Sequence, residues 1–248
     1  MRPLREKIIP EYNYRKLQLR LTFAPTDFYT SVATNQSIDE PFIDSSEHKT
    51  SSLREKYLKN QDLRDSGYLM DSKLANMFGI ALATITEDNK ILLQERSKYV
   101  FMSKTKITLT TAENMIRGID VDIHGNPDIF NTAQRCLREE VGLNIEKKDC
   151  VFLGFGVRLD NMLPQALGMV KLKMNSDELT FDHARDKWEG FNFTEDFSFE
   201  ALRKYFEEPD LVSSTAKLTI LLALINHYSF EEIEKQAKMI PKQEVYSL

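Results

Sequence analysis

Apolar residues gather in short runs along the middle of this chain and predict a β-rich core. The run MFGIALATI, from Met77 to Ile85, is continuously apolar, and ILLQERS follows it after the turn residues EDNK. Short apolar runs joined by turn residues are typical of buried strands and hairpins. Two more such runs, CVFLGFGVRL and QALGMVKLKM, flank the turn DNMLP. We therefore predict a central hairpin followed by two further strands.

A different spacing marks one short helix between these strands, in the segment TAQRCLREEVGL from Thr132 to Leu143. Its apolar residues recur every four positions and form a narrow stripe that can pack against a core: Ala133, Leu137 and Val141. We expect Asn126 to cap this helix, Pro127 to fill its first position and Gly142 to end it in the left-handed conformation. A strand-rich core with one intervening helix is consistent with an α/β/α sandwich.

The two ends of the chain predict further elements. Near the C-terminus, AKLTILLALINHYSFEEIEKQA is typical of one helix that packs into the core. In the N-terminal part, YRKLQLRLTF alternates like a strand, DFYTSVATN begins a helix, the polar SIDEPFIDSSEHKTSS is a mobile loop, and LREKYLKNQDLRDS is an amphipathic helix. We therefore predict an N-terminal extension over residues 1–70, a main domain over 71–240 and a short tail over 241–248.

The composition narrows the class of protein. The 248 residues are 42% hydrophobic and carry a net charge of −5, with an isoelectric point near 5.5. An acidic chain is a poor match to broad nucleic-acid binding, so we expect no nucleic-acid partner. The two cysteines, Cys136 and Cys150, have a spacing that fits neither a zinc site nor a disulfide framework, which indicates a reducing compartment. No apolar signal region follows MRPLREK and the run LTILLALI is too short to cross a bilayer, so we expect a cytoplasmic protein with no membrane partner.

The helix also carries the clearest candidate chemistry of the chain. Glu139 and Glu140 follow Cys136 by three and four residues, so the three side chains project toward one region beside the apolar stripe. Two carboxylates there can bind Mg²⁺, which prefers oxygen ligands and bridges a protein to substrate phosphates without a full protein cage. Arg135, one turn before Glu139, can orient that glutamate. A solvated acidic helix face is the alternative that spacing alone leaves open.

The helix resembles the motif of the Nudix family, which consists of Gly, five residues, Glu, seven residues and then R-E-U-x-E-E-x-G-U, where U is aliphatic. Six of the seven specified positions in the second half agree: Arg135, Leu137, Glu139, Glu140, Gly142 and Leu143. Cys136 replaces the Glu that joins the paired glutamates as a metal ligand in the family. In the first half, the family's Gly and Glu fall on Val121 and Pro127, so the loop before the helix must be built differently. The end of the central hairpin also resembles the family's L-L-x-x-R: Leu92, Leu93 and Arg96.

The resemblance implies a Nudix-like α/β/α sandwich with an N-terminal extension, acting as a hydrolase that uses Mg²⁺ or Mn²⁺ to cleave a diphosphate linkage in a nucleoside diphosphate derivative. Glu139 and Glu140 would bind the metal, and Glu113 is our hypothesis for the carboxylate that Cys136 does not supply. A downstream carboxylate often assists the metal or the attacking water in the family. We assign that role first to Glu189, beside the single tryptophan, and second to Glu195.

A diphosphate substrate is strongly anionic, so basic and aromatic residues near the hairpin are candidates to bind it. Arg96 at a strand end can meet phosphate through two hydrogen bonds. Tyr99 and Phe101 can stack on a base, with a solvated loop as the alternative. The N-terminal extension can shape substrate choice, cover the cleft or form a homodimer interface, and these three roles stay open.

Other functions also stay open at this point. A Nudix-like module that binds a nucleotide derivative without hydrolysis is favoured by Cys136 and by the missing first half of the motif. An enzyme like isopentenyl diphosphate isomerase would keep the fold, although its expected catalytic Cys is not identifiable in this chain. A structural or interaction protein would leave the glutamate pair merely solvated.

Overall fold

The computed structural model describes residues 21–44, 49–58, 73–99, 104–180, 190–208 and 210–238, which divide into two compact units. One unit contains the described residues up to Phe78 together with 157–164, and the other contains the rest. The tail predicted over 241–248 lies outside the described residues. None of the helices in these ranges is both long and apolar enough to span a bilayer.

The first unit holds short elements. Helix α1, Phe28–Ser31, continues into the π-helix η1, Val32–Gln36, and helix α2 spans Leu53–Leu58. Strands β1 and β2, Phe42–Asp44 and Lys49–Ser51, form an antiparallel pair. The helix predicted in DFYTSVATN is confirmed, whereas part of the polar segment expected as a mobile loop pairs as β1 and β2. Most of the strand predicted in YRKLQLRLTF, and the part of the next predicted helix after α2, lie outside the described residues.

The second unit is built on a mixed sheet in which the predicted hairpin is central. Its seven strands are β3 Gly79–Ile85, β4 Lys90–Arg96, β5 Ile107–Leu109, β6 Thr111–Asn114, β7 Cys150–Val157, β8 Pro164–Lys171 and β9 Gly190–Asp196. Strand β3 runs antiparallel to β4 and β6 and parallel to β8, and β4 runs antiparallel to β5 and β9. The order along the sheet is β5-β4-β3-β8-β7. The hairpin and the two later strands are therefore confirmed.

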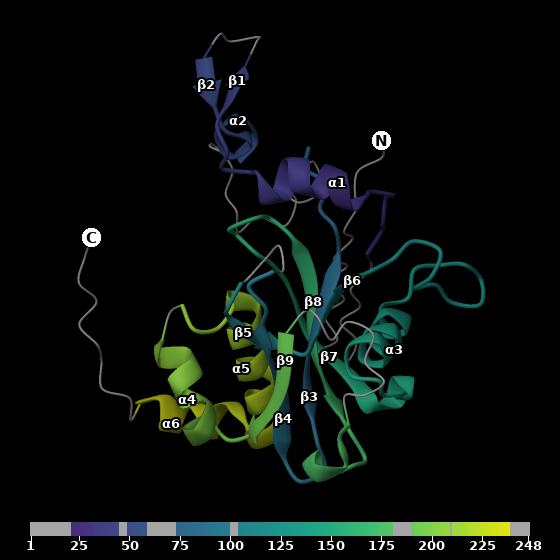
Figure 1. Ribbon diagram of the computed structural model, residues 1–248, viewed down its shortest axis with the longest axis vertical. Coiled ribbons are helices and arrows are strands. Elements are labelled where there is room, and N and C mark those ends of the chain that lie inside the picture. The colour runs from purple at the N-terminus through teal and green to yellow at the C-terminus, as the bar shows by residue number, and fades with distance from the viewer. Residues whose placement is uncertain are drawn as a thin grey trace, which may run out of the picture. The chain divides into compact units, whose positions relative to one another are not determined.

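Helices cover both faces of this sheet (Figure 1). Helix α3, Ile129–Glu140, packs on β3 and β6 from one side. On the other side lie α4, Phe199–Glu207, α5, Ser214–Tyr228, and α6, Phe230–Lys238. Residues of β3 alternate between these layers, because successive side chains of a strand point to opposite faces. One set joins a buried core with α5: Ala81, Ala83 and Ile85. The described elements confirm the predicted α/β/α sandwich.

Three predictions about helix ends are corrected by the structure. The single C-terminal helix is in fact α5 and α6, because Ser229 between them has a φ of 121°, which no helix accommodates. The cap of α3 is Asp128, whose carboxylate accepts a hydrogen bond from the Phe130 amide, and not Asn126, which donates to Asp122 instead. Helix α3 consequently starts at Ile129, and the prediction that Pro127 fills its first position is wrong, because Pro127 lies before the cap. Its end is as predicted, since Gly142 has a φ of 77°.

Candidate functional site

Arg135 lies at the centre of a buried polar network on the sheet side of α3. Its side chain is 4% exposed, and its Nε and one terminal nitrogen donate to the two carboxylate oxygens of Asp120 at 2.9 and 3.0 Å. The same terminal nitrogen donates to the Asn114 carbonyl at 2.7 Å, and the other donates to Glu139 at 2.9 Å. Arg135 therefore joins three segments: the loop before α3, strand β6, and the last turn of α3.

The electrostatics of Arg135 follow from these contacts. Burial alone would lower the pKa of the guanidinium, but the hydrogen bonds with Asp120 and Glu139 raise it above its ordinary value. The group is thus a permanent cation held by two carboxylates. Glu139 accepts a hydrogen bond from Arg135, the residue one helical turn before it, as the spacing predicted.

Glu113 reaches the same region from the sheet. It lies within β6, where it pairs with Ile80 of β3. Directly paired residues of antiparallel strands share a face, and Ile80 alternates with the residues that face α5. Glu113 therefore points to the face that α3 covers. The next residue, Asn114, is the one whose carbonyl bonds Arg135, so the backbone beside Glu113 is tied to α3.

Cys136 lies within electrostatic range of three carboxylates. Its thiol is fully buried, and burial raises its pKa well above the ordinary value; the negative charges of Glu140, Glu113 and Glu139 raise it further. Arg135 acts in the opposite direction. Three carboxylates from β6 and α3 are therefore close enough to act on one thiol, which stays protonated and neutral.

Glu140 differs from Glu139 in its surroundings. Glu140 is a buried residue, whereas the Glu139 side chain is 21% exposed and bonded to Arg135. A buried carboxylate is unfavourable unless it has partners or binds a cation. The adjacent pair thus presents one carboxylate at the surface and one inside.

The donor chemistry around Cys136 fits Mg²⁺ or Mn²⁺ in kind, since these hard cations prefer carboxylate oxygens. The thiol at Cys136 does not, because thiolates suit softer metals. Within the described ranges, no three His, Cys, Asp or Glu side chains are grouped so that they could hold an ion together. Two carboxylates completed by water and substrate phosphate therefore match the residues present, because Mg²⁺ usually keeps several waters.

Other residues predicted for the site lie elsewhere or outside the described residues. Arg96 ends β4 and donates to Gln94 at 3.2 Å, and Gln94 in turn donates to Asn192 of β9. Tyr99 is 78% exposed, with the Lys98 ammonium 5.1 Å from its ring centre. Glu195, the second candidate for the downstream carboxylate, accepts hydrogen bonds from Lys204 and Tyr205 of α4. Helix α4 lies on the opposite face of the sheet from α3. The remaining two lie outside the described residues: Glu189 and Phe101.

Sequence reasoning missed Asp120, the main partner of Arg135. Its carboxylate is 1% exposed and also accepts a hydrogen bond from the Ile116 amide at 2.8 Å. It lies in a loop that holds several aspartates, fifteen residues before Arg135, so helical periodicity gives no signal for it.

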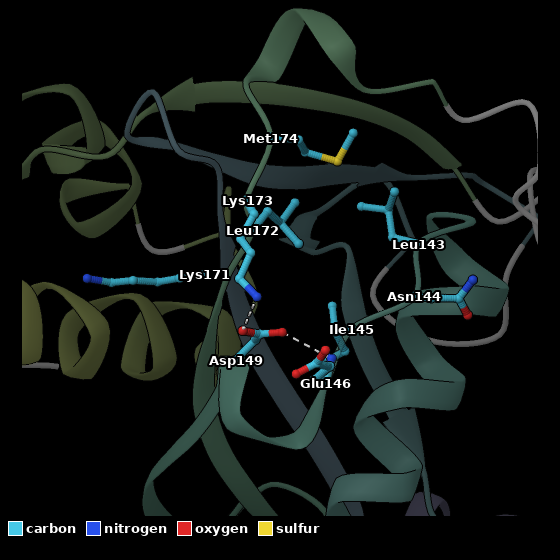
Figure 2. Close-up of a pocket in the computed structure, with 9 residues that line it drawn as sticks. All are labelled: Leu143, Asn144, Ile145, Glu146, Asp149, Lys171, Leu172, Lys173 and Met174. Carbon is cyan, nitrogen blue, oxygen red and sulfur yellow. Dashed lines mark hydrogen bonds and ion pairs between the residues drawn. The ribbon is translucent and has the colours of Figure 1, made fainter.

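A small pocket of about 230 Å³ lies beyond the end of α3 (Figure 2). Both apolar and charged side chains line it; the apolar ones are Leu143, Ile145, Leu172 and Met174, and among the charged ones Lys173 pairs with Asp149 at 3.2 Å. None of the predicted site residues lines this pocket. It is therefore separate from the carboxylates around Cys136.

Similarity to known proteins is found among solved structures only. No family model matches the sequence, and no curated protein matches it. The Nudix domain of Shewanella oneidensis NrtR complexed with ADP ribose is similar at 13% identity, covering 70% of this chain and 97% of that chain, with a TM-score of 0.43. A Nudix hydrolase from Nitrosomonas europaea is similar at 12% identity, covering 60% and 89%, with a TM-score of 0.40. A MutT protein from Methanosarcina mazei Go1 is similar at 11% identity, covering 65% and 95%, with a TM-score of 0.41.

The chain thus resembles Nudix proteins both in the motif of α3 and among solved structures. At these identities and TM-scores the structural similarity says nothing about activity.

Proposed function

We propose that this chain is a Nudix-type hydrolase that cleaves a diphosphate linkage in a nucleoside diphosphate derivative and depends on Mg²⁺ or Mn²⁺. The observation that carries the proposal is the adjacent pair Glu139 and Glu140 at the end of α3, where Arg135 bonds Glu139 and the helix packs on the strand that holds Glu113. Neighbouring carboxylates repel one another, and a bound cation removes that cost. Such a cation is also what an anionic diphosphate needs.

Each residue would have a distinct role. Glu139 and Glu140 would hold the metal, and Glu113 would face it from β6. Arg135 would keep the Glu139 carboxylate in one orientation through its hydrogen bond. When bound, the metal would offset the charge of the diphosphate and lower the pKa of a water molecule. Arg96 for phosphate, Tyr99 and Phe101 for a base, and Glu189 as the general base remain predictions.

The test is release of phosphate or mononucleotide from a panel of ADP-ribose, NAD, nucleotide sugars and nucleoside triphosphates, with Mg²⁺ or Mn²⁺. Glu140→Gln removes one carboxylate charge from α3 without changing its apolar stripe, so turnover and Mn²⁺ binding should both be lost. Glu200→Gln on the exposed side of α4 is the matched control and should keep both. Turnover that is equal in wild type and Glu140→Gln would remove this site from the reaction.

The second candidate is a module that binds a nucleotide derivative without hydrolysing it. The neutral, buried thiol of Cys136 favours it, because the family's third carboxylate on this helix is missing. In that case no member of the panel is turned over, while one of them raises the melting temperature even when EDTA is present. Ligand stabilisation that requires the metal would instead favour the hydrolase.

A further inference from the structure

Asp120 is the one acidic residue of this network that the family motif does not contain. It is almost fully buried, it lies in the loop between β6 and α3, and it bonds Arg135 through both of its oxygens. We infer that Asp120 is a positioning residue for the metal site, acting through Arg135 on Glu139. The inference rests on the proposed function, because it assumes that Glu139 is a metal ligand.

The first argument is geometric. A guanidinium is planar, and a carboxylate that accepts two parallel hydrogen bonds fixes the orientation of that plane. Asp120 does this for Arg135, and the Asn114 carbonyl takes a further donor on the same side. The nitrogen that remains donates to Glu139 at 2.9 Å. The direction of the Glu139 carboxylate is therefore set by a residue that lies fifteen positions before Arg135 in the chain.

The second argument concerns charge. The Arg135 guanidinium is paired with Glu139, and because like charges repel, it opposes the binding of a metal ion there. Asp120 lies in direct contact with that cation and balances it. The negative charge of Glu139 and Glu140 is then left to attract a divalent ion. Without Asp120, Arg135 would draw more strongly on Glu139 and would repel the metal.

A purely structural role is the competing explanation, because Asp120 also makes hydrogen bonds that stabilise the loop between β6 and α3. Its backbone carbonyl accepts from the Asp128 amide at 2.9 Å, and its carboxylate accepts from the Ile116 amide. Asp122 offers a matched control two residues away. Its carboxylate accepts from the amides of His124 and Asn126, so it shapes the same loop without bonding Arg135.

The experiment measures Mn²⁺ affinity directly, from the electron paramagnetic resonance signal of the free ion, together with the melting temperature. The full chain is used as wild type, Asp120→Asn, Asp122→Asn, Arg135→Gln and the Asp120→Asn/Arg135→Gln double variant. Asp120→Asn should bind Mn²⁺ roughly 10-fold to 100-fold more weakly, as is usual when a residue supporting a metal ligand is changed. Asp122→Asn should bind Mn²⁺ like wild type even where its melting temperature falls.

The double variant tests whether Asp120 acts through Arg135. If it does, the double variant loses no more Mn²⁺ affinity than either single variant; losses that multiply would overturn the inference. The double variant also removes both buried charges together, which is far less disruptive than leaving one unpaired. If Asp120→Asn does not fold, Arg135→Gln and the double variant decide: equal Mn²⁺ affinity in these two variants supports the role, and a further loss in the double variant would overturn it.

The two proposals fail in different ways. Wild type that neither binds Mn²⁺ nor turns over any substrate refutes the proposed function. Wild type that binds Mn²⁺, with Asp120→Asn binding it equally well, refutes only the role of Asp120.

Discussion

Cys136 and Glu140 lie one turn apart on α3, and after burial the charge of Glu140 is the largest contribution that raises the pKa of the Cys136 thiol. The Cys136 thiol is therefore neutral, at a position where the Nudix motif has a carboxylate. Glu113 and Glu139 act on the same thiol. The site is therefore both acidic and short of one motif ligand, which leads to the first prediction.

Replacing Cys136 by Glu should create a protein whose stability depends on metal. The larger side chain enters a fully buried position, and overpacking of this kind costs about 1–3 kcal/mol. Its charge adds a fourth carboxylate to the cluster. We expect urea denaturation to show lower stability than wild type in EDTA, and a larger gain in stability on adding Mn²⁺.

Cys136→Gln is the control for this change, because it has the same size as Glu without the charge. It should be destabilised by overpacking and should gain no extra stability from Mn²⁺. If the two variants respond equally to Mn²⁺, Cys136 does not face a metal site.

Cys150 predicts a dependence of stability on pH. Burial raises the pKa of this thiol to about 12, from an ordinary 9.0. Above about pH 9 the unfolded chain loses this proton while the folded chain keeps it, so the free energy of unfolding falls as pH rises toward 12. Below that pH both states hold the proton and the contribution is constant.

Urea denaturation at about pH 8 and about pH 10 checks this dependence. Wild type should lose more stability between the two pH values than Cys150→Ala does. The remaining cysteine is the same in both proteins, so it cancels from the comparison. Equal losses would show that Cys150 ionises as freely in the folded chain as in the unfolded one.

Gly168 of β8 should not tolerate a side chain. A Cβ there would stand 2.5 Å from the Val151 carbonyl oxygen and 3.1 Å from the Phe152 Cα, both backbone atoms of the neighbouring strand β7. Strands must move apart to relieve such contacts, so Gly168→Ala should lower the free energy of unfolding by at least about 1–3 kcal/mol. Gly156→Ala on β7 is the matched control, because nothing lies within 4 Å of its added Cβ. Similar urea midpoints for the two variants would contradict the close approach of β7 and β8.

Ser229 between α5 and α6 carries backbone strain that glycine should relieve. Its φ of 121° and ψ of 161° lie in a region that is essentially restricted to glycine and costs about 1–3 kcal/mol for other residues. Its hydroxyl accepts a hydrogen bond from the Glu232 amide at 3.3 Å, a cap whose loss to glycine costs only a few tenths of a kcal/mol. Ser229→Gly should therefore raise the melting temperature, and Ser229→Ala, which keeps the strain and loses the cap, should lower it. A lower melting temperature for both would mean that the cap outweighs the strain.

The local pattern of apolar and polar residues was sufficient to predict the main strands of the second unit and its helix α3. The strands β3, β4, β7 and β8 follow apolar runs between turn residues, and α3 follows a stripe of period four that ends at Gly142. These features depend on neighbours in sequence, so sequence can show them. The break at Ser229 also had a local signal that the sequence prediction did not use, because S-F-E-E from Ser229 to Glu232 matches the capping-box pattern that begins a new helix.

The sequence by itself determined the residues of the motif on α3, namely Arg135, Glu139 and Glu140, because their spacing along one helix sets their relative directions. Only the tertiary structure decided which partners meet them. Pairing of β6 with β3 turns Glu113 toward α3, and closure of the loop before the helix brings Asp120 against Arg135. Strand register and loop closure join residues far apart in the chain through contacts that form only once the core has packed, so no local pattern encodes them.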